Sequence, residues 1–296
     1  MGEACERAMV GRIVVGTSGW SQFGENSYPP GLPPGDRLAW YAERFEGVEV
    51  DSTFYAVPAQ RTVARWAGVT PSGFTFDVKL HRLLSRHAAP PSSLPTDLRE
   101  QAKLTNSGRV ALDPPLELAL CRRTLRAVEP LREAGKLSSF LLQLTPAFKP
   151  ADHQLCELEP LLGALAPERV SIELRHRDWL REGEPTIDWF RAVGAAFVCV
   201  DAPQVKAPSV LPPVDAVTRE DLAYLRAHGR NAEGYLRGRT ATERFDWRYS
   251  EAELQEIAAR AGGLARAATH VRLMFGNGSH ALAGAHSMRA ILGQTG

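Results

Sequence analysis

The sequence has 296 residues, and 44% of them are hydrophobic, which is enough to form a substantial buried core. Its 35 Lys and Arg residues nearly balance its 34 Asp and Glu residues, which leaves a formal net charge of +1 at pH 7. This balance argues against nucleic-acid or membrane binding driven by overall charge, although it is compatible with a local basic cleft. No segment approaches the run of about 18 apolar residues that a membrane-spanning helix needs.

The cysteines and the N-terminal residues indicate the compartment. The four cysteines are scattered without a CxxC spacing, a pattern typical of free thiols rather than of a zinc site or a disulfide framework. Residues 1–11 lack the long apolar run of a signal peptide. We therefore expect a disordered lead-in over residues 1–11, a single domain over residues 12–296, and a cytoplasmic protein.

Eight short runs rich in β-branched or aromatic side chains are predicted to form strands. In chain order they are Ile13–Gly16, Val48–Asp51, Phe74–Lys79, Ser139–Leu144, Val170–Leu174, Ala196–Asp201, Leu222–Arg226 and His270–Phe275. The seventh run competes for its place with Gly234–Arg237.

Segments with helical spacing of apolar residues lie between these runs. They are Asp36–Phe45, Gln60–Ala67, Leu116–Leu131, Leu155–Leu165, Ile187–Val193 and Glu251–Ala261, the last preceded by a capping box over Ser250–Glu253. Alternation of strands and helices predicts a parallel sheet, and eight strands predict an α/β fold with a single TIM-like (β/α)8 barrel. Two long connections, Ser21–Gly35 and His81–Asn106, are typical of functional lids or disordered loops.

The carboxyl ends of parallel barrel strands share one mouth, where catalytic groups usually lie. The most informative of these ends is Val170–Trp179, because its apolar strand pattern passes abruptly into ionisable side chains and an indole. Glu173 lies within the strand, where burial is expected to raise its pKa toward neutrality while Arg175 opposes the rise. Arg175 should share its face with Glu173, and His176 should lie on the opposite face. The alternative is a fully ionised, structural Glu173–Arg175 pair.

The other strand ends complete the predicted site. The candidate catalytic residues are Glu173, Asp201, Lys79 and His228, and Glu173 with Asp201 could form a carboxylate pair for acid–base chemistry. Asp77, Lys79 and His81 should share one side of the third strand. The candidate substrate-binding residues are Trp20, Asp51, Tyr55, Gln143, Arg175, His176, Trp179, Arg226, Arg230, Asn231 and Asn277. Each position also has a structural alternative, such as a tight turn, an Asx turn or an ion pair inside the barrel.

The charged groups at these ends favour an anionic ligand. Arg guanidinium groups bind phosphate or carboxylate in a bidentate manner, and Arg175, Arg226 and Arg230 are predicted to converge on the mouth. Exposed aromatic side chains could stack on a base or a sugar, and the candidates are Trp20, Tyr55, Trp179 and Trp247.

A divalent metal is compatible with the site but is not favoured. His176, His228 and His280, with Glu173 and Asp201, show no metal-ligand spacing. The sequence also contains no GxSxG, HExxH, P-loop or dinucleotide-binding motif. We expect the pocket to accept anions before metals.

Motifs in order along the chain resemble those of the YecE-like family, domain of unknown function 72, from Arg12 to about Leu292. They are GTSGW at Gly16–Trp20, YPPGLPP at Tyr28–Pro34, FEGVEVDSTFYAVP at Phe45–Pro58, FTFDVK at Phe74–Lys79, QLTPAF at Gln143–Phe148, ELRHRDW at Glu173–Trp179, HGRN at His228–Asn231 and FDWRYSEAEL at Phe245–Leu254. The resemblance implies a TIM-like barrel and a candidate mouth, but no reaction.

The chain departs from the family's pattern in three places. Gly276 stands before Asn277 where the family usually has Asn-Asn, Ala283–Met288 replaces a following Asn-Ala, and Pro90–Leu120 fits loosely.

Three functions fit these observations. The first is a barrel hydrolase or lyase acting on an anionic, phosphate-bearing substrate, such as a nucleotide or a nucleic-acid end. The second is a non-catalytic protein that binds a small molecule or a nucleic acid, in which the same charges pair with one another. The third is a carbohydrate-active barrel that uses a carboxylate pair.

Overall fold

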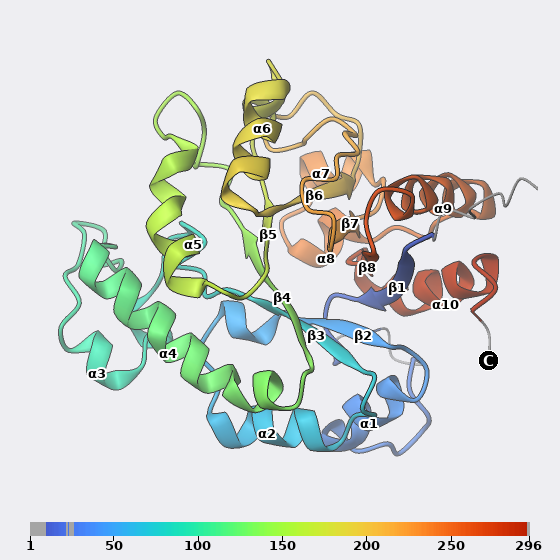
Figure 1. Cartoon of the computed structure of the whole chain (residues 1–296), viewed down its shortest axis with the longest axis horizontal. Helices are drawn as coiled ribbons and strands as arrows, with labels where there is room; N and C mark the ends of the chain where they lie inside the picture. The colour runs from blue at the N-terminus through green and yellow to red at the C-terminus, as the bar shows by residue number, and fades with distance from the viewer. Residues whose placement is uncertain (1–9, 22, 24–26, 295–296) are drawn as a thin grey trace, which may run out of the picture.

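Eight parallel strands form a nearly closed barrel (Figure 1). The computed structural model describes residues 10–21, 23 and 27–294. The strands are β1 (Arg12–Thr17), β2 (Gly47–Val50), β3 (Thr75–Lys79), β4 (Leu137–Gln143), β5 (Val170–Glu173), β6 (Ala196–Asp201), β7 (Ala223–Ala227) and β8 (His270–Phe275). They are paired in the order β1-β8-β7-β6-β5-β4-β3-β2. A single bridge between Ser18 and Glu49 links the two end strands, β1 and β2.

Helices surround the strands. They are α1 (Arg37–Ala42), α2 (Gln60–Gly68), α3 (Thr96–Arg99), α4 (Pro114–Glu133), α5 (Glu159–Leu165), α6 (Glu184–Val193), α7 (Ala232–Arg237), α8 (Ala241–Phe245), α9 (Glu251–Ala265) and α10 (Ala281–Ile291). Helices α9 and α10 lie beside β1 and β8 (Figure 1). The predicted TIM-like barrel is therefore confirmed, including the seventh strand, because Gly234–Arg237 lies in α7.

Local sequence explains where the longest helices begin. The Asp113 carboxylate accepts a hydrogen bond from the Leu116 amide at 3.0 Å, and a proline occupies the first turn of α4. The predicted capping box begins α9: the Ser250 hydroxyl accepts from the Glu253 amide, and the Glu253 carboxylate accepts from the Ser250 amide. Four helices were not predicted: α3, α7, α8 and α10.

The barrel interior contains a buried ion pair below its mouth. Side chains alternate between the two faces of a strand, so Asp77 on β3 and Arg272 on β8 both point inward. Arg272 Nε donates to Asp77 Oδ2 at 2.7 Å, and Ser139 Oγ donates to Asp77 Oδ1 at 2.9 Å. These three residues are at most 2% exposed, so they fill the lower part of the barrel, and solvent reaches the interior from the mouth above them.

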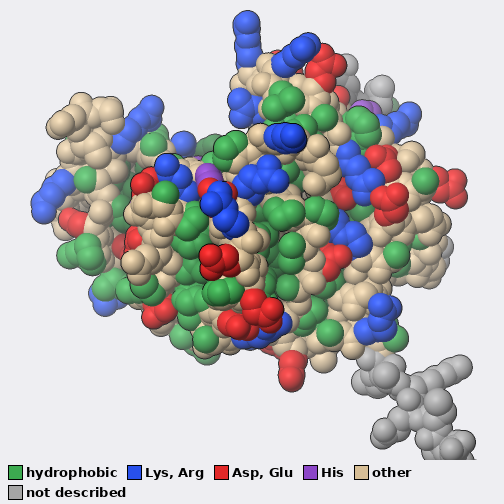
Figure 2. Space-filling model, turned by 90° about the horizontal axis from the view of Figure 1, so that it is seen from above, with side chains coloured by type: hydrophobic (Ala, Val, Ile, Leu, Met, Phe, Trp, Pro, Cys, Tyr) green, Lys and Arg blue, Asp and Glu red, His purple; other side chains and the backbone are tan. Residues whose placement is uncertain are grey.

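The outside of the molecule fits the balanced charge of the sequence. Figure 2 shows Lys and Arg side chains close to Asp and Glu side chains across one face. In the part of the chain that is described, no helix is both long enough and apolar enough to cross a membrane. Residues 1–9 of the predicted lead-in lie outside the described residues.

Candidate active site at the barrel mouth

A buried arginine joins two carboxylates at the centre of the mouth. Arg226 extends from β7 and is 3% exposed. Its Nε and Nη2 donate to the two oxygens of Glu49 at 2.8 and 2.7 Å, and its Nη1 donates to Glu173 Oε2 at 2.5 Å. Glu49 and Glu173 are fully buried on β2 and β5. With His228, which contacts Glu173, these residues form what we call the mouth network.

Glu173 accepts hydrogen bonds from several donors. Its Oε1 accepts from Arg175 Nη1 at 2.9 Å and from Gln143 Nε2 at 3.1 Å, and it lies 3.1 Å from His228 Nε2. Burial by itself would raise the pKa of Glu173, but Arg226, His228 and Arg175 hold that pKa well below its usual range. The prediction that the pKa of Glu173 rises is therefore wrong. The sequence indicated only Arg175 as an opposing cation, whereas the folded chain also brings Arg226 against this carboxylate.

His228 is held in one tautomer by this carboxylate. A ring nitrogen 3.1 Å from a carboxylate oxygen must carry a proton, so Nε2 is the protonated nitrogen. Burial lowers the pKa of His228, and the opposing charge of Glu173 does not restore it to its ordinary value. The imidazole is therefore neutral near pH 7, with a lone pair on Nδ1. No described residue donates a hydrogen bond to Nδ1, although His228 is only 6% exposed.

Sequence reasoning missed Glu49. It lies between two valines in the second predicted strand, where only Asp51 was singled out. A carboxylate inside an apolar strand was the signal that identified Glu173, and the same signal was present at Glu49. Glu49 also accepts hydrogen bonds from Tyr224 Oη at 2.8 Å and from Ser18 Oγ.

A group of cations lies beside the mouth network. Lys79 Nζ is 3.1 Å from Asp51 Oδ1, and Lys79 lies over the Phe54 ring. Arg82 also lies against the Phe54 ring, and that ring contacts His87. Burial lowers the pKa of His87, and the charges of Lys79, Arg82 and Arg175 lower it further, so all three cations act on this histidine. We call Lys79, Arg82 and Arg175 the cation cluster.

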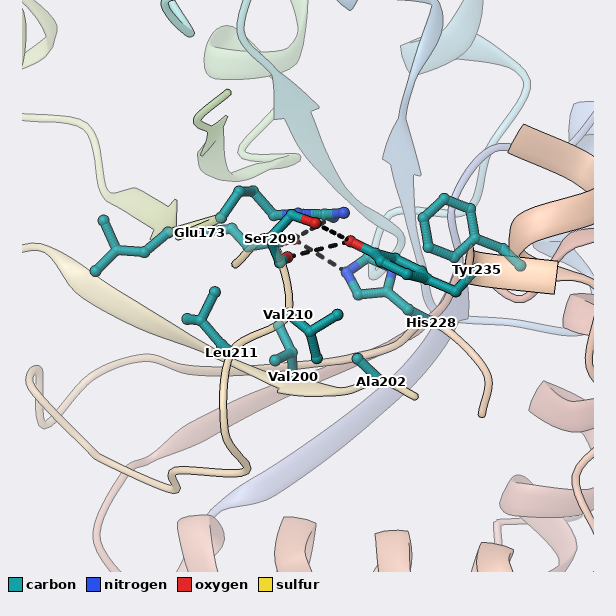
Figure 3. A pocket seen from close by; sticks show the side chains of 11 residues that line it. Glu173, Val200, Ala202, Ser209, Val210, Leu211, His228 and Tyr235 are labelled. Carbon is teal, nitrogen blue, oxygen red and sulfur yellow. Dashed lines mark hydrogen bonds and ion pairs between the residues drawn. The ribbon is translucent and has the colours of Figure 1, made fainter. Parts of the chain in front are cut away.

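A narrow pocket opens onto Glu173 and His228 (Figure 3). Its lining comprises Glu173, Leu174, Arg175, Val200, Ala202, Ser209, Val210, Leu211, His228, Tyr235 and Phe245. Its free volume of about 10 Å³ is close to the minimum that one water molecule needs. The Ser209 and Tyr235 hydroxyls are hydrogen-bonded at 2.7 Å and join the loop after β6 to α7 (Figure 3). A larger ligand therefore requires these two segments to separate.

A second, open groove adjoins this pocket and shares Ser209 with it. The groove has a volume of about 590 Å³ and is lined by Pro146, Ala147, Lys149, Asp152, His176, Pro208 and Ser209. His176 therefore faces this groove, whereas Glu173 and Arg175 face the pocket, in agreement with the predicted alternation.

Asp201 and Arg230 lie outside the pocket lining and bind each other. Arg230 Nη2 donates to Asp201 Oδ2 at 2.8 Å, and Asp201 also accepts from Tyr249 Oη at 2.8 Å. The reason is strand alternation: Val200 and Ala202 line the pocket, so Asp201 points the other way, toward Arg260 on α9. The structure thus pairs Glu173 with Glu49 rather than with Asp201.

Of the three arginines predicted to converge on the mouth, Arg175 and Arg226 both donate to Glu173 there, whereas Arg230 lies outside the pocket lining. Arg226 is bound to Glu49 and Glu173, and Arg230 is bound to Asp201 and Glu256. Arg175 remains in the pocket lining.

The candidate aromatic residues differ in exposure. Tyr55 is 63% exposed, in agreement with the prediction. Trp179 is 8% exposed, and its Nε1 donates to the Phe148 carbonyl at 2.8 Å, so it belongs to the core. Trp20 contacts the edge of Trp66, and Trp247 is partly buried against the core. The expectation of four exposed rings is wrong because amphipathic rings at strand ends also cover the core.

The two candidate asparagines have local partners. Asn231 Oδ1 accepts from the Gly234 amide at 2.8 Å and caps α7. Asn277 is fully buried, and its Nδ2 donates to the Trp247 carbonyl at 2.7 Å.

The remaining histidines do not join His228. His280 lies 3.8 Å from Asp246. His81 follows the end of β3, so strand alternation does not place His81 on the same face as Lys79. Within residues 10–21, 23 and 27–294, no three His, Cys, Asp or Glu side chains form a group that could hold a metal ion.

His81 is expected to make folding sensitive to acid. Its Nδ1 accepts from the Leu83 amide, and its Nε2 lies 3.2 Å from the Ser93 carbonyl, so the buried ring is neutral. Burial lowers the pKa of His81 to about 4, whereas the unfolded value is about 6.5. The unfolded chain binds the proton more tightly, so this contribution is complete above pH 6.5 and is lost as the pH falls toward 4.

Urea unfolding at several pH values between 7 and 4 checks this expectation. The variant His81→Gln should lose less stability over that interval than the wild type, and His270→Gln, at the exposed first position of β8, should not. Equal slopes for the wild type and His81→Gln would contradict it.

Comparison with known proteins identifies the family. The chain belongs to the family described as protein of unknown function DUF72, which matches residues 14–296. It is 27% identical over 273 residues to UPF0759 protein YunF of Bacillus subtilis, a match that covers 90% of this chain and 89% of that protein.

Solved structures of two DUF72 family proteins are similar along most of the chain. The protein from Thermotoga maritima is 28% identical with a TM-score of 0.75, covering 95% of this chain and 99% of that one. The protein from Enterococcus faecalis is 22% identical with a TM-score of 0.76, covering 96% and 99%. These similarities confirm the family resemblance and the barrel, and they assign no reaction.

Proposed function

We propose that this DUF72 protein is a hydrolase that acts on an anionic, phosphate-bearing substrate at the mouth of its barrel. The observation that carries the proposal is the neutral His228, oriented by Glu173, in the same pocket as the Arg175 guanidinium. A neutral imidazole held by an ionised carboxylate is a common general base, because the carboxylate fixes the tautomer and stabilises the imidazolium that forms.

In this proposal the roles of the predicted residues change. Glu173 does not transfer protons itself, because its pKa lies well below its usual range and it stays ionised. His228 Nδ1 accepts a proton from water. Arg175 and the other members of the cation cluster bind the phosphate, since Arg175 has only one of its guanidinium nitrogens bonded to Glu173.

For a phosphomonoester the reaction balances without a further reactant. The water oxygen bonds to phosphorus, the bond between phosphorus and the leaving oxygen breaks, and a water proton passes to His228. His228 then gives that proton to the leaving oxygen, so the products are an alcohol and inorganic phosphate.

The carbohydrate-active alternative receives less support. A glycosidase needs one carboxyl group that is protonated and one that is free to act as base or nucleophile. Glu49 and Glu173 both bind Arg226, and the pKa of Glu173 is lowered rather than raised. The non-catalytic alternative keeps one favourable observation, namely that Glu173 is paired and ionised, and turnover measurements distinguish it.

Calorimetry with inorganic phosphate tests the anion-binding part of the proposal. We expect the wild type to bind phosphate and Arg175→Gln to bind it about tenfold more weakly, because a charge-assisted hydrogen bond contributes about 1.5–3 kcal/mol. Arg181→Gln is the matched control, since Arg181 is an exposed arginine paired with Asp178. Equal phosphate affinity in both variants would contradict the proposal.

A substrate panel tests the catalytic part. It should contain p-nitrophenyl phosphate, nucleotides and a 5′-phosphorylated oligonucleotide, with phosphate release as the readout. Release that requires His228 supports a hydrolase, and binding without release by any member supports the non-catalytic function.

A further inference from the structure

Gly276 has no side chain and lies beside two polar atoms of the mouth, Ser18 Oγ and His228 Nδ1. Gly276 follows β8, and its amide donates to the Ala227 carbonyl at 2.9 Å, which continues the barrel ladder by one residue. Because Arg272 points inward, strand alternation places position 276 on the inner face. A Cβ built on Gly276 would lie 3.2 Å from Ser18 Oγ and 3.6 Å from His228 Nδ1. We call the space between these three residues the Gly276 notch.

Both polar atoms of the notch have a lone pair free. Ser18 Oγ donates its proton to Glu49 Oε2 and accepts from Arg226 Nη2 at 3.1 Å, so one of its two lone pairs is unused. His228 Nδ1 carries a lone pair, because the proton is on Nε2 against Glu173. His228 is only 6% exposed, and no described residue donates a hydrogen bond to its Nδ1. The notch therefore presents two acceptors and no side-chain donor to a bound molecule.

We propose that the Gly276 notch holds the reacting water, and this inference rests on the proposed hydrolase function. A water molecule there would donate one proton to His228 Nδ1 and the other to Ser18 Oγ. Its oxygen lone pair then faces a phosphate bound by Arg175, and His228 is placed to take the proton as the new oxygen–phosphorus bond forms. The absence of a side chain at position 276 is thus a requirement for hydrolysis.

Oxygen exchange into inorganic phosphate tests this without a known substrate. In this reaction water attacks [18O4]phosphate, a labelled oxygen leaves as water after taking up a proton, and mass spectrometry counts the remaining label. Gly276→Ala should slow exchange by about 100-fold, because its methyl group displaces the water that general-base catalysis needs. The phosphate dissociation constant should change less than about threefold, since the cation cluster is unaltered.

The alanine is compatible with the backbone, because Gly276 does not have a positive φ. Gly262→Ala on α9 is the matched control, since a Cβ there meets no atom within 4 Å, and it should exchange at the wild-type rate. Ser18→Ala keeps the space but removes the hydroxyl that would accept from the water, together with its hydrogen bonds to Glu49 and Arg226, and it should slow exchange about tenfold. If Gly276→Ala does not fold, Ser18→Ala decides the outcome.

The outcomes separate the notch from the function. A wild type that neither binds phosphate nor exchanges its oxygen refutes the hydrolase function. Phosphate binding without exchange refutes the notch proposal, and phosphate release from the substrate panel then decides between a hydrolase and a binding protein. Exchange in the wild type that persists unchanged in Gly276→Ala, or in Ser18→Ala if that variant alone folds, places the water elsewhere and leaves the hydrolase function intact.

Discussion

Arg226→Met is expected to destabilise the protein by about 3–5 kcal/mol, because it leaves two buried carboxylates without their shared cation. Glu49 would keep Tyr224 and Ser18 as donors, and Glu173 would keep Arg175. Both carboxylates would lose the guanidinium of Arg226. Methionine has a similar volume and flexibility, so the loss reports charge rather than a cavity. Urea unfolding at pH 7 measures the effect.

The pH dependence of this loss distinguishes the charge explanation from simple misfit. Arg226 lowers the pKa of Glu173 in the wild type, so without Arg226 that pKa rises. The variant then binds a proton more readily as the pH falls, and its stability deficit relative to the wild type should shrink. Arg230→Met is the matched control: Asp201 would keep Arg260 and Tyr249, and we expect a loss of about 1 kcal/mol. An equal loss in the two variants would show that the mouth network is not special.

Glu173→Gln is expected to lower turnover of any phosphoester substrate by about two to four orders of magnitude. The neutral amide no longer stabilises the imidazolium form of His228, and its NH2 group must face one of the donors that now bind the carboxylate. Phosphate should bind as tightly as before or more tightly, because a negative charge beside Arg175 has been removed. Steady-state kinetics and calorimetry on the same preparation provide both readouts.

Asp201→Asn is the informative comparison, because Asp201 was an equal candidate in the sequence but lies outside the pocket lining. It should retain turnover once measured under conditions where the variant is folded. If Glu173→Gln does not fold, His228→Gln leaves the pairs of Arg226 intact and should lose a similar factor. Full turnover in either Glu173→Gln or His228→Gln would remove the proposed acid–base assignment.

The sequence predicted the barrel because strand-forming runs and helical segments alternate along its whole length. It also predicted that Glu173, Arg175 and His228 share the mouth, since strand ends converge in a parallel barrel. It could not predict which arginine binds which carboxylate: Arg226 and Glu49 are 177 residues apart, and their contact depends on barrel closure. The pKa of Glu173 was mispredicted for the same reason.

Two kinds of position were difficult in principle. Asp201 is the last residue of its strand, where a shift of one residue decides between the pocket and the helix layer, and sequence patterns locate strand ends poorly. The helices α7 and α8, which with the loop after β6 cover the pocket, are short, and their stability depends on contacts such as the Ser209–Tyr235 hydrogen bond rather than on periodicity.

The sequence separations within the mouth network have a consequence for how the protein folds. Arg226 bonds to Glu173 across 53 residues and to Glu49 across 177, so both pairs require the chain to be almost fully wound before they can form. Contacts between distant residues bear a large loop-closure entropy and are expected to form after the rate-limiting barrier. The mouth network should therefore form after the folding transition state, so that it slows unfolding of the barrel and has little effect on its folding rate.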